Sequence, residues 1–117
     1  MSPRERSWIL ASAECRANGP AEIVIPPRWR RETLPQGCFV QLLLLPARGW
    51  SFPETPVWVR LARRRKAIYQ GVLEKAPASA IPGLEVGEVL EFEPEHVFDW
   101  LEGRPSRRLR PIADEEA

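Results

Sequence analysis

The side chains best suited to acid–base or metal chemistry gather in one stretch, EFEPEHVFDW, from Glu91 to Trp100. It holds four carboxylates together with His96, the only histidine of the chain. In a helical turn Glu95, His96 and Asp99 would share one face, because residues three or four apart are neighbours there. A zinc site usually needs three or four converging ligands, most of them His or Cys. One histidine among carboxylates falls short of that, so we expect a solvated acidic rim, no metal and no cofactor.

Nucleophilic catalysis is the second chemistry to consider, since the chain contains Cys15 and Cys38. A catalytic thiol needs a base, a group that orients the base, and donors for the oxyanion. Cys38 begins the apolar run CFVQLLLL, where cysteine usually behaves as a small hydrophobic residue. The sequence also lacks a G-x-S-x-G motif and a glycine-rich phosphate loop. We therefore expect a protein that is not an enzyme.

The glutamates that precede Pro94 fit the outer side of a β-strand. Leu90 and Phe92 alternate with Glu91 and Glu93, and successive side chains of a strand point to opposite faces. The pattern predicts two apolar side chains in a core and two carboxylates in water.

Composition limits the kind of object that must position these residues. A chain of 117 residues suits one domain, which we expect to span 1–103, with a flexible charged tail over 104–117. The formal net charge of +1 provides no overall field to attract nucleic acid or a membrane. No apolar stretch begins the chain, and CFVQLLLLP is too short for a membrane span. With two isolated cysteines, these features predict a cytoplasmic protein.

Charges are segregated along the chain. Five cations and no acid lie between Arg60 and Lys66, whereas seven acids and no Lys or Arg lie between Glu85 and Glu102. The chain has fifteen Arg and two Lys, and Arg suits bidentate contacts to carboxylate or phosphate. An Arg excess also follows from a GC-rich genome, so it does not by itself indicate a function.

Hydrophobic periodicity and turn residues predict a β-rich fold. A central strand covered on both faces fits 38–45, and two alternating runs at 57–62 and 67–73 predict a hairpin with four cations at one end. Shorter strands are expected at 8–10, in AEIVIPP and at 88–93, with helical turns from Ser12 and in PRWRRETL, where Trp29 and Leu34 would face inward. We predict an α+β, mainly β domain: a bent antiparallel sheet of four to six strands, with one or two short N-terminal helices. An SH3-like or barrel-like curl is one form open to it.

From about Ala21 onward the chain resembles the YegJ-like family of small bacterial domains of unknown function. Five short motifs carry the resemblance in order: Gly37 followed by FVQLLL, VWVRL with Trp58, G-x-L-x-x-x-P at Gly71, Leu73 and Pro77, the turn at Gly87, and VFDW with Asp99 and Trp100. The chain departs from the family pattern at Pro56 and at Lys75, where such domains often carry Asn. The resemblance implies a small β-rich domain without established enzymatic activity, and it transfers no catalytic residue.

Five tryptophans and many arginines form the composition of protein-interface hot spots. We therefore predict a binding module for a protein partner, such as an accessory or inhibitory subunit of a bacterial system. The alternative is RNA or single-stranded DNA bound through the Arg-rich hairpin. The sequence leaves the oligomeric state open. The predicted contact residues are Trp50 and Phe52 in a long loop, and Arg63, Arg64, Arg65, Lys66 and Tyr69 on the hairpin.

Overall fold

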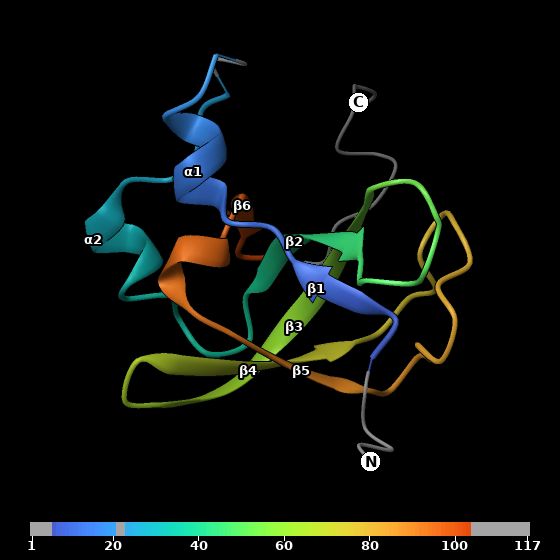
Figure 1. Cartoon of the computed structure of the whole chain (residues 1–117). Coiled ribbons are helices and arrows are strands. Elements are labelled where there is room, and N and C mark those ends of the chain that lie inside the picture. Colours follow the sequence, from blue (N-terminus) through green and yellow to red (C-terminus); the bar gives the residue numbers. More distant parts are fainter. Residues whose placement is uncertain (1–5, 21–22, 104–117) are drawn as a thin grey trace, which may run out of the picture.

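The computed structural model describes residues 6–20 and 23–103, so the tail predicted at 104–117 lies outside the described residues. Its centre is a curled, six-stranded antiparallel sheet with two short helices at one side (Figure 1). This confirms the predicted α+β, mainly β class. The elements are β1 (Trp8–Leu10), α1 (Ala13–Ala17), α2 (Arg28–Arg31), β2 (Phe39–Pro46), β3 (Thr55–Arg65), β4 (Ile68–Leu73), β5 (Val89–Phe92), the 3₁₀ turn η1 (Pro94–His96) and β6 (Asp99–Leu101).

The strands follow the order β1-β2-β3-β4-β5, and β6 also pairs with β2. Because β3 occupies one edge of β2, both terminal strands lie along its other edge, β6 beside 39–41 and β1 beside 44–46. The sheet curls without a β1–β5 pairing among the described strands. Ser7, which precedes β1, donates a hydrogen bond from its hydroxyl to the carbonyl of Pro82, in the loop before β5, at 2.6 Å. This bond connects the segments that lead into β1 and β5.

The apolar run at 39–46 forms the central strand β2, as predicted, but only one of its faces is fully buried. Val40, Leu42 and Leu44 are inaccessible to solvent, whereas Gln41 and Leu43 are half-buried on the opposite face. The expectation of burial on both faces was therefore wrong for Gln41 and Leu43, although Phe39 on the same face is buried. The inner face packs against the other strands in one hydrophobic cluster.

The β3–β4 hairpin continues into the cationic run. Arg65 pairs with Ile68, which leaves Lys66 and Ala67 as the turn, and Lys66 takes a φ of 55°. An irregularity between Leu61 and Arg63 shifts the register by one residue. The four cations thus lie at one end of the hairpin, as expected.

The first helix begins as predicted, since the Ser12 hydroxyl accepts a hydrogen bond from the Cys15 amide at 3.1 Å.

The strand predicted in AEIVIPP was wrong for its described part, because residues 23–27 form no strand. Pro26 and Pro27 lack the N–H that a sheet ladder requires. Residues 21 and 22 of that prediction lie outside the described residues.

The second helix places Arg31 inward and Trp29 outward. Positions two apart in a helix differ by about 200° around its axis, and Arg31 is only 6% exposed whereas Trp29 is 62% exposed. The prediction that Trp29 faces inward was wrong for this reason. Leu34, beyond the helix, is buried as predicted.

Strand β5 has the predicted alternation. Leu90 and Phe92 are buried, whereas Glu91 and Glu93 are exposed, and Phe92 stacks on Tyr69 with ring centres 5.3 Å apart. No helix in the described part of the chain is long and apolar enough to cross a membrane.

Gly71 in β4 has a packing requirement that can be tested. A Cβ atom there would lie 2.5 Å from Cγ2 of Val59 and 2.9 Å from its Cβ. We expect Gly71→Ala to lower the free energy of unfolding by about 1–3 kcal/mol through overpacking, measured by urea denaturation. Gly103→Ala is the matched control, since its Cβ would contact nothing within 4 Å. Equal denaturation midpoints for the two variants would contradict this account.

Candidate functional site

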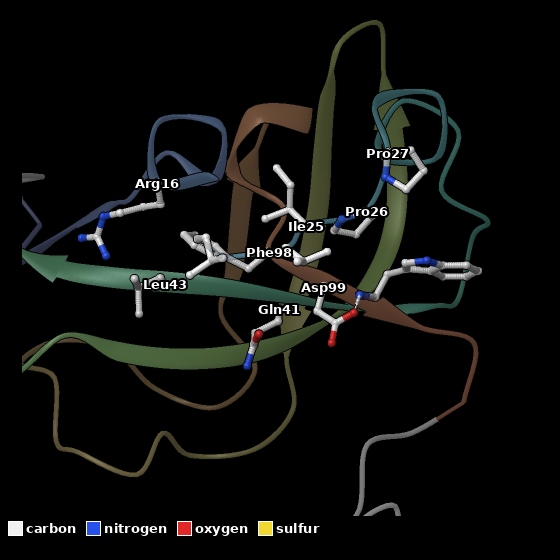
Figure 2. A pocket seen from close by; sticks show the side chains of 11 residues that line it. Arg16, Ile25, Pro26, Pro27, Gln41, Leu43, Phe98 and Asp99 are labelled. Atoms are coloured by element: carbon white, nitrogen blue, oxygen red, sulfur yellow. Dashed lines mark hydrogen bonds between the residues drawn. The ribbon is translucent and has the colours of Figure 1, made fainter. Parts of the chain in front are cut away.

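An open groove of about 670 Å³ lies along the outer face of β2 (Figure 2). Its floor is formed by Gln41 and Leu43, and its walls come from the irregular segment 23–27 and from residues 98–100. The volume is in the range of ligand-binding clefts. Apolar side chains predominate in its lining, which consists of Arg16, Ile23, Val24, Ile25, Pro26, Pro27, Gln41, Leu43, Phe98, Asp99 and Trp100.

Charged side chains are found at both ends of the groove, and each already has a partner. Arg16 forms an ion pair with Glu54 at 3.0 Å. Toward Trp100, the guanidinium of Arg30 lies 4.6 Å from the centre of the Trp100 ring and 4.7 Å from that of Trp29. One cation is thus flanked by two indoles, an attractive arrangement between a positive charge and the negative faces of aromatic rings.

The floor of the groove carries an available amide. The Gln41 backbone carbonyl accepts the Phe98 amide at 3.0 Å, but the Gln41 carboxamide makes no hydrogen bond to another described residue. Asp99 is occupied differently, since its Oδ1 accepts the Trp100 amide at 2.8 Å. A carboxamide has two donor hydrogens and one acceptor oxygen, which match the groups of a peptide backbone.

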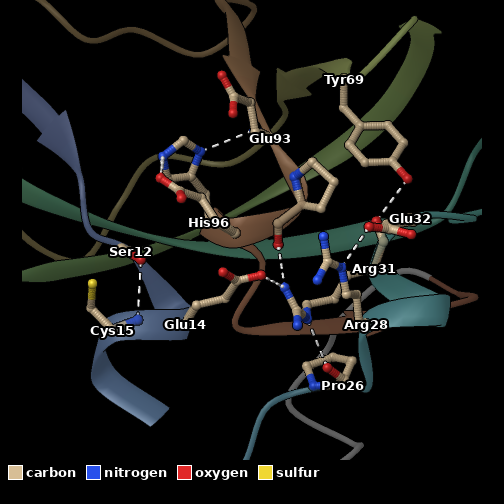
Figure 3. A network of polar contacts seen from close by, with 12 residues as sticks. Ser12, Glu14, Cys15, Pro26, Arg28, Arg31, Glu32, Tyr69, Glu93 and His96 are labelled. Atoms are coloured by element: carbon tan, nitrogen blue, oxygen red, sulfur yellow. Dashed lines mark hydrogen bonds and ion pairs between the residues drawn. The ribbon is translucent and has the colours of Figure 1, made fainter. Parts of the chain in front are cut away.

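A buried guanidinium holds the wall of the groove in place (Figure 3). Arg31 donates to the Pro26 carbonyl at 2.8 Å, to the Glu14 carboxylate at 2.6 Å and to the Pro94 carbonyl at 3.1 Å. Its own carbonyl accepts the Tyr69 hydroxyl at 2.7 Å. The segment after α1, the helix α2, the turn η1 and strand β4 are therefore joined at one residue.

The structure does not bring the predicted contact residues together. Trp50 and Phe52 lie in the loop before β3, whereas the cations lie at the other end of that strand, about 30 Å away along an extended chain. Trp50 is 48% exposed, and Phe52 packs partly against the core. Within the described residues the two groups of predicted contacts therefore lie at opposite ends of β3.

Tyr69 needs a separate correction. Its side chain is completely buried, and its hydroxyl accepts the Leu34 amide at 3.3 Å while donating to Arg31. The ring is thus part of the core and is not available to a partner on the surface.

The four hairpin cations are exposed, but they differ in their contacts. Arg63 donates to the Gln70 side chain at 2.9 Å. Arg64 bonds the carbonyls of Lys66 and Glu32 and lies 5.2 Å from the Tyr69 ring centre. The side chains of Arg65 and Lys66 contact no acid in the described part of the chain.

The acidic stretch around His96 forms a local turn. The His96 Nδ1 accepts the Glu93 amide at 3.0 Å, and its Nε2 lies 3.3 Å from Glu95. Asp99 caps its neighbour instead of joining them. Among the described residues, no three His, Cys, Asp or Glu side chains gather as a metal site would require.

The two cysteines lie in different environments. Cys15 is exposed and Cys38 is buried, and neither forms a disulfide. Burial raises the pKa of the Cys38 thiol to about 11, because a low-dielectric surrounding disfavours the thiolate. Cys38 therefore lacks the activated character of a nucleophile at neutral pH.

Sequence reasoning missed Gln41, Trp29 and Trp100 as candidate contacts. Gln41 is the single polar residue within the apolar run FVQLLLL, which was a signal available in advance. Trp29 is exposed because Arg31 is the buried residue of α2, and no pattern in the sequence of this helix predicts that. Trp100 packs partly against the core and also lines the groove.

Comparison with known proteins returned nothing: no family model, no curated protein and no solved structure matches the chain. The resemblance to the YegJ-like family stays a prediction.

The role of Arg31 can be tested by removing its side chain. We expect Arg31→Ala to lower the free energy of unfolding by about 2–4 kcal/mol, because two backbone carbonyls and a carboxylate lose their donor. Arg28→Ala in the same helix removes only an exposed pair with Glu32 and should change the free energy by less than about 1 kcal/mol. Urea denaturation of both variants measures the difference, and similar losses would refute a special role for Arg31.

The two thiols should react in sequence. At pH 8 a maleimide should label Cys15 in the folded protein and Cys38 only after unfolding, as mass spectrometry can show.

The raised pKa of Cys38 also predicts a pH effect, because the thiol ionises more readily in the unfolded chain. Its contribution to stability is complete below about pH 9 and is lost as the pH rises toward 11. Between about pH 9 and 11 Cys38→Ala should therefore lose less free energy of unfolding than the parent protein. In the labelling experiment, reaction of both thiols in the folded state would contradict the burial of Cys38.

Proposed function

We propose that the protein is a non-enzymatic binding module that holds an extended segment of a protein partner in the groove on β2. The observation that carries this proposal is the carboxamide of Gln41, which makes no hydrogen bond to another described residue, in the floor of a largely apolar groove. Apolar walls gain from burying side chains of a segment, and the carboxamide can bond one of its peptide groups.

The surroundings of the groove support a protein segment as its occupant. Val24 on its wall is 92% exposed, and the exposed indole of Trp29 lies across Arg30 from Trp100. Exposed apolar and aromatic side chains beside a concave surface are typical of protein contacts. Arg16 and Asp99 already have partners, so the groove offers little unpaired charge and favours an occupant recognised by shape and apolar contact.

The positions of His96, Cys15 and Cys38 support a role without catalysis. The imidazole Nδ1 is engaged by a backbone amide, and the buried thiol has a raised pKa. The proposal includes a cytoplasmic location, which the exposed free thiol of Cys15 suits. We also propose that the protein belongs to the YegJ-like family and acts as an accessory or inhibitory subunit of a bacterial system.

A peptide selection tests the groove. Short random peptides displayed on phage would be selected on the whole protein, and the affinities of the enriched peptides measured by fluorescence anisotropy. Val24→Asp should weaken these peptides at least about 10-fold, since it places a charge on the apolar wall. Gln41→Leu keeps the size of the side chain, removes its amide, and should weaken them as well.

The matched control is Val86→Asp, because Val86 is also exposed, at 56%, and does not line the groove. This variant should bind the peptides like the parent protein. Peptides that bind all three variants with the parent affinity would contradict the proposal, as would a selection that enriches none.

A further inference from the structure

The hairpin tip is fastened to helix α2 by one of its own cations. Arg64 donates to the carbonyl of Glu32, the residue that caps the end of α2, and also to the carbonyl of Lys66. Its guanidinium lies over the Tyr69 ring. In Figure 1 the tip of the β3–β4 hairpin and α2 accordingly lie at the same side of the sheet. Two Arg-rich segments that are about thirty residues apart in sequence thus become neighbours.

The joined segments form a basic surface, which we define as Arg28, Arg30, Arg63, Arg65 and Lys66. Two glutamates lie beside this surface. Glu32 forms an ion pair with Arg28 at 2.8 Å, and Glu91 accepts a hydrogen bond from the Gln70 side chain at 3.0 Å. Arg65 and Lys66 are exposed and meet no acid within the described residues. The surface therefore carries a local positive charge that the net charge of the chain conceals.

Protection of a sheet edge is the simplest alternative role for these cations. Lysines and arginines on an edge strand prevent strand-to-strand association, but β3 lies between β2 and β4, and β4 lies between β3 and β5. Where β3 extends past β2, Gln36 donates to the Ala62 carbonyl at 2.9 Å and Arg64 reaches α2. The tip itself projects beyond both neighbouring strands, since the β2–β3 pairing ends at Arg60 and the β4–β5 pairing at Tyr69, so the cations can protect this edge as well as bind a ligand.

An exposed indole lies within the basic surface. Trp29 is held in α2 between Arg28 and Arg30, and its carbonyl accepts the Thr33 hydroxyl at 2.7 Å. Nucleobases stack on such rings whatever their sequence, and arginines beside them bind phosphates. The basic surface thus offers the two contacts that a single strand uses, an aromatic face for a base and cations for phosphates.

We propose that the basic surface binds single-stranded nucleic acid, with Arg63, Arg65 and Lys66 on phosphates and a base stacked on Trp29. This site is separate from the groove, since none of these four residues lines it. Relative to the contact face predicted from the sequence, α2 with Trp29 replaces Trp50 as the aromatic partner of the hairpin.

The test measures binding of fluorescein-labelled oligo(dT) and oligo(U) to the whole protein by anisotropy over a series of salt concentrations. We expect Arg65→Glu with Lys66→Glu to lower the affinity at least about 10-fold and to flatten the plot of log Kd against log salt. The slope should fall by about 0.7 for each phosphate contact that is lost. Trp29→Ala should weaken binding with an unchanged slope, because stacking releases no counterions.

The matched control is Arg48→Glu with Lys75→Glu, which changes the net charge equally at exposed positions away from the hairpin tip. It should bind like the parent protein, as should Val24→Asp in the groove. The proposal falls if the parent protein binds neither oligonucleotide below about 100 µM at low salt, or if the control loses as much affinity. It also falls if polyglutamate competes as well as an oligonucleotide of equal charge, which would identify a site for acidic proteins.

Discussion

The buried guanidinium of Arg31 is the interaction on which the arrangement of both surfaces depends. A charge withdrawn from water is tolerated only where donors and acceptors compensate it, and here a carboxylate and two backbone carbonyls do so. These partners belong to segments that have little regular structure of their own. The helices α1 and α2 have five and four residues, too few to be stable alone. Their positions therefore come from this polar centre and from the apolar core beneath it.

The same side chain determines what α2 presents to solvent. With Arg31 inward, the opposite side of the short helix carries Trp29, and the flanking Arg30 is drawn between the rings of Trp29 and Trp100. The groove on β2 and the basic surface at the hairpin thus share a border at Arg30.

The sheet was largely predictable from the sequence, and the surfaces were not. Alternation around Leu90, the apolar run of β2 and the Ser12 cap are local patterns, so they identify elements without knowledge of the fold. Which side chain of RWRR becomes buried depends on Glu14 and Pro94, far away in sequence, together with the nearby Pro26 carbonyl. Tyr69 was misplaced for the same reason, because its hydroxyl bonds α2 and Leu34. The position of the cations at one end of the hairpin was predicted correctly, but their neighbour is α2.

The pairing of both terminal strands with one edge of β2 has a consequence for local opening. β6 occupies one half of that edge and β1 the other, so any displacement of β2 releases these two strands together. Strands β3, β4 and β5, by contrast, follow one another as sequential neighbours and can stay paired while β1 and β6 detach. Amide exchange of β1 and β6 should then occur as one cooperative unit, distinct from that of the meander.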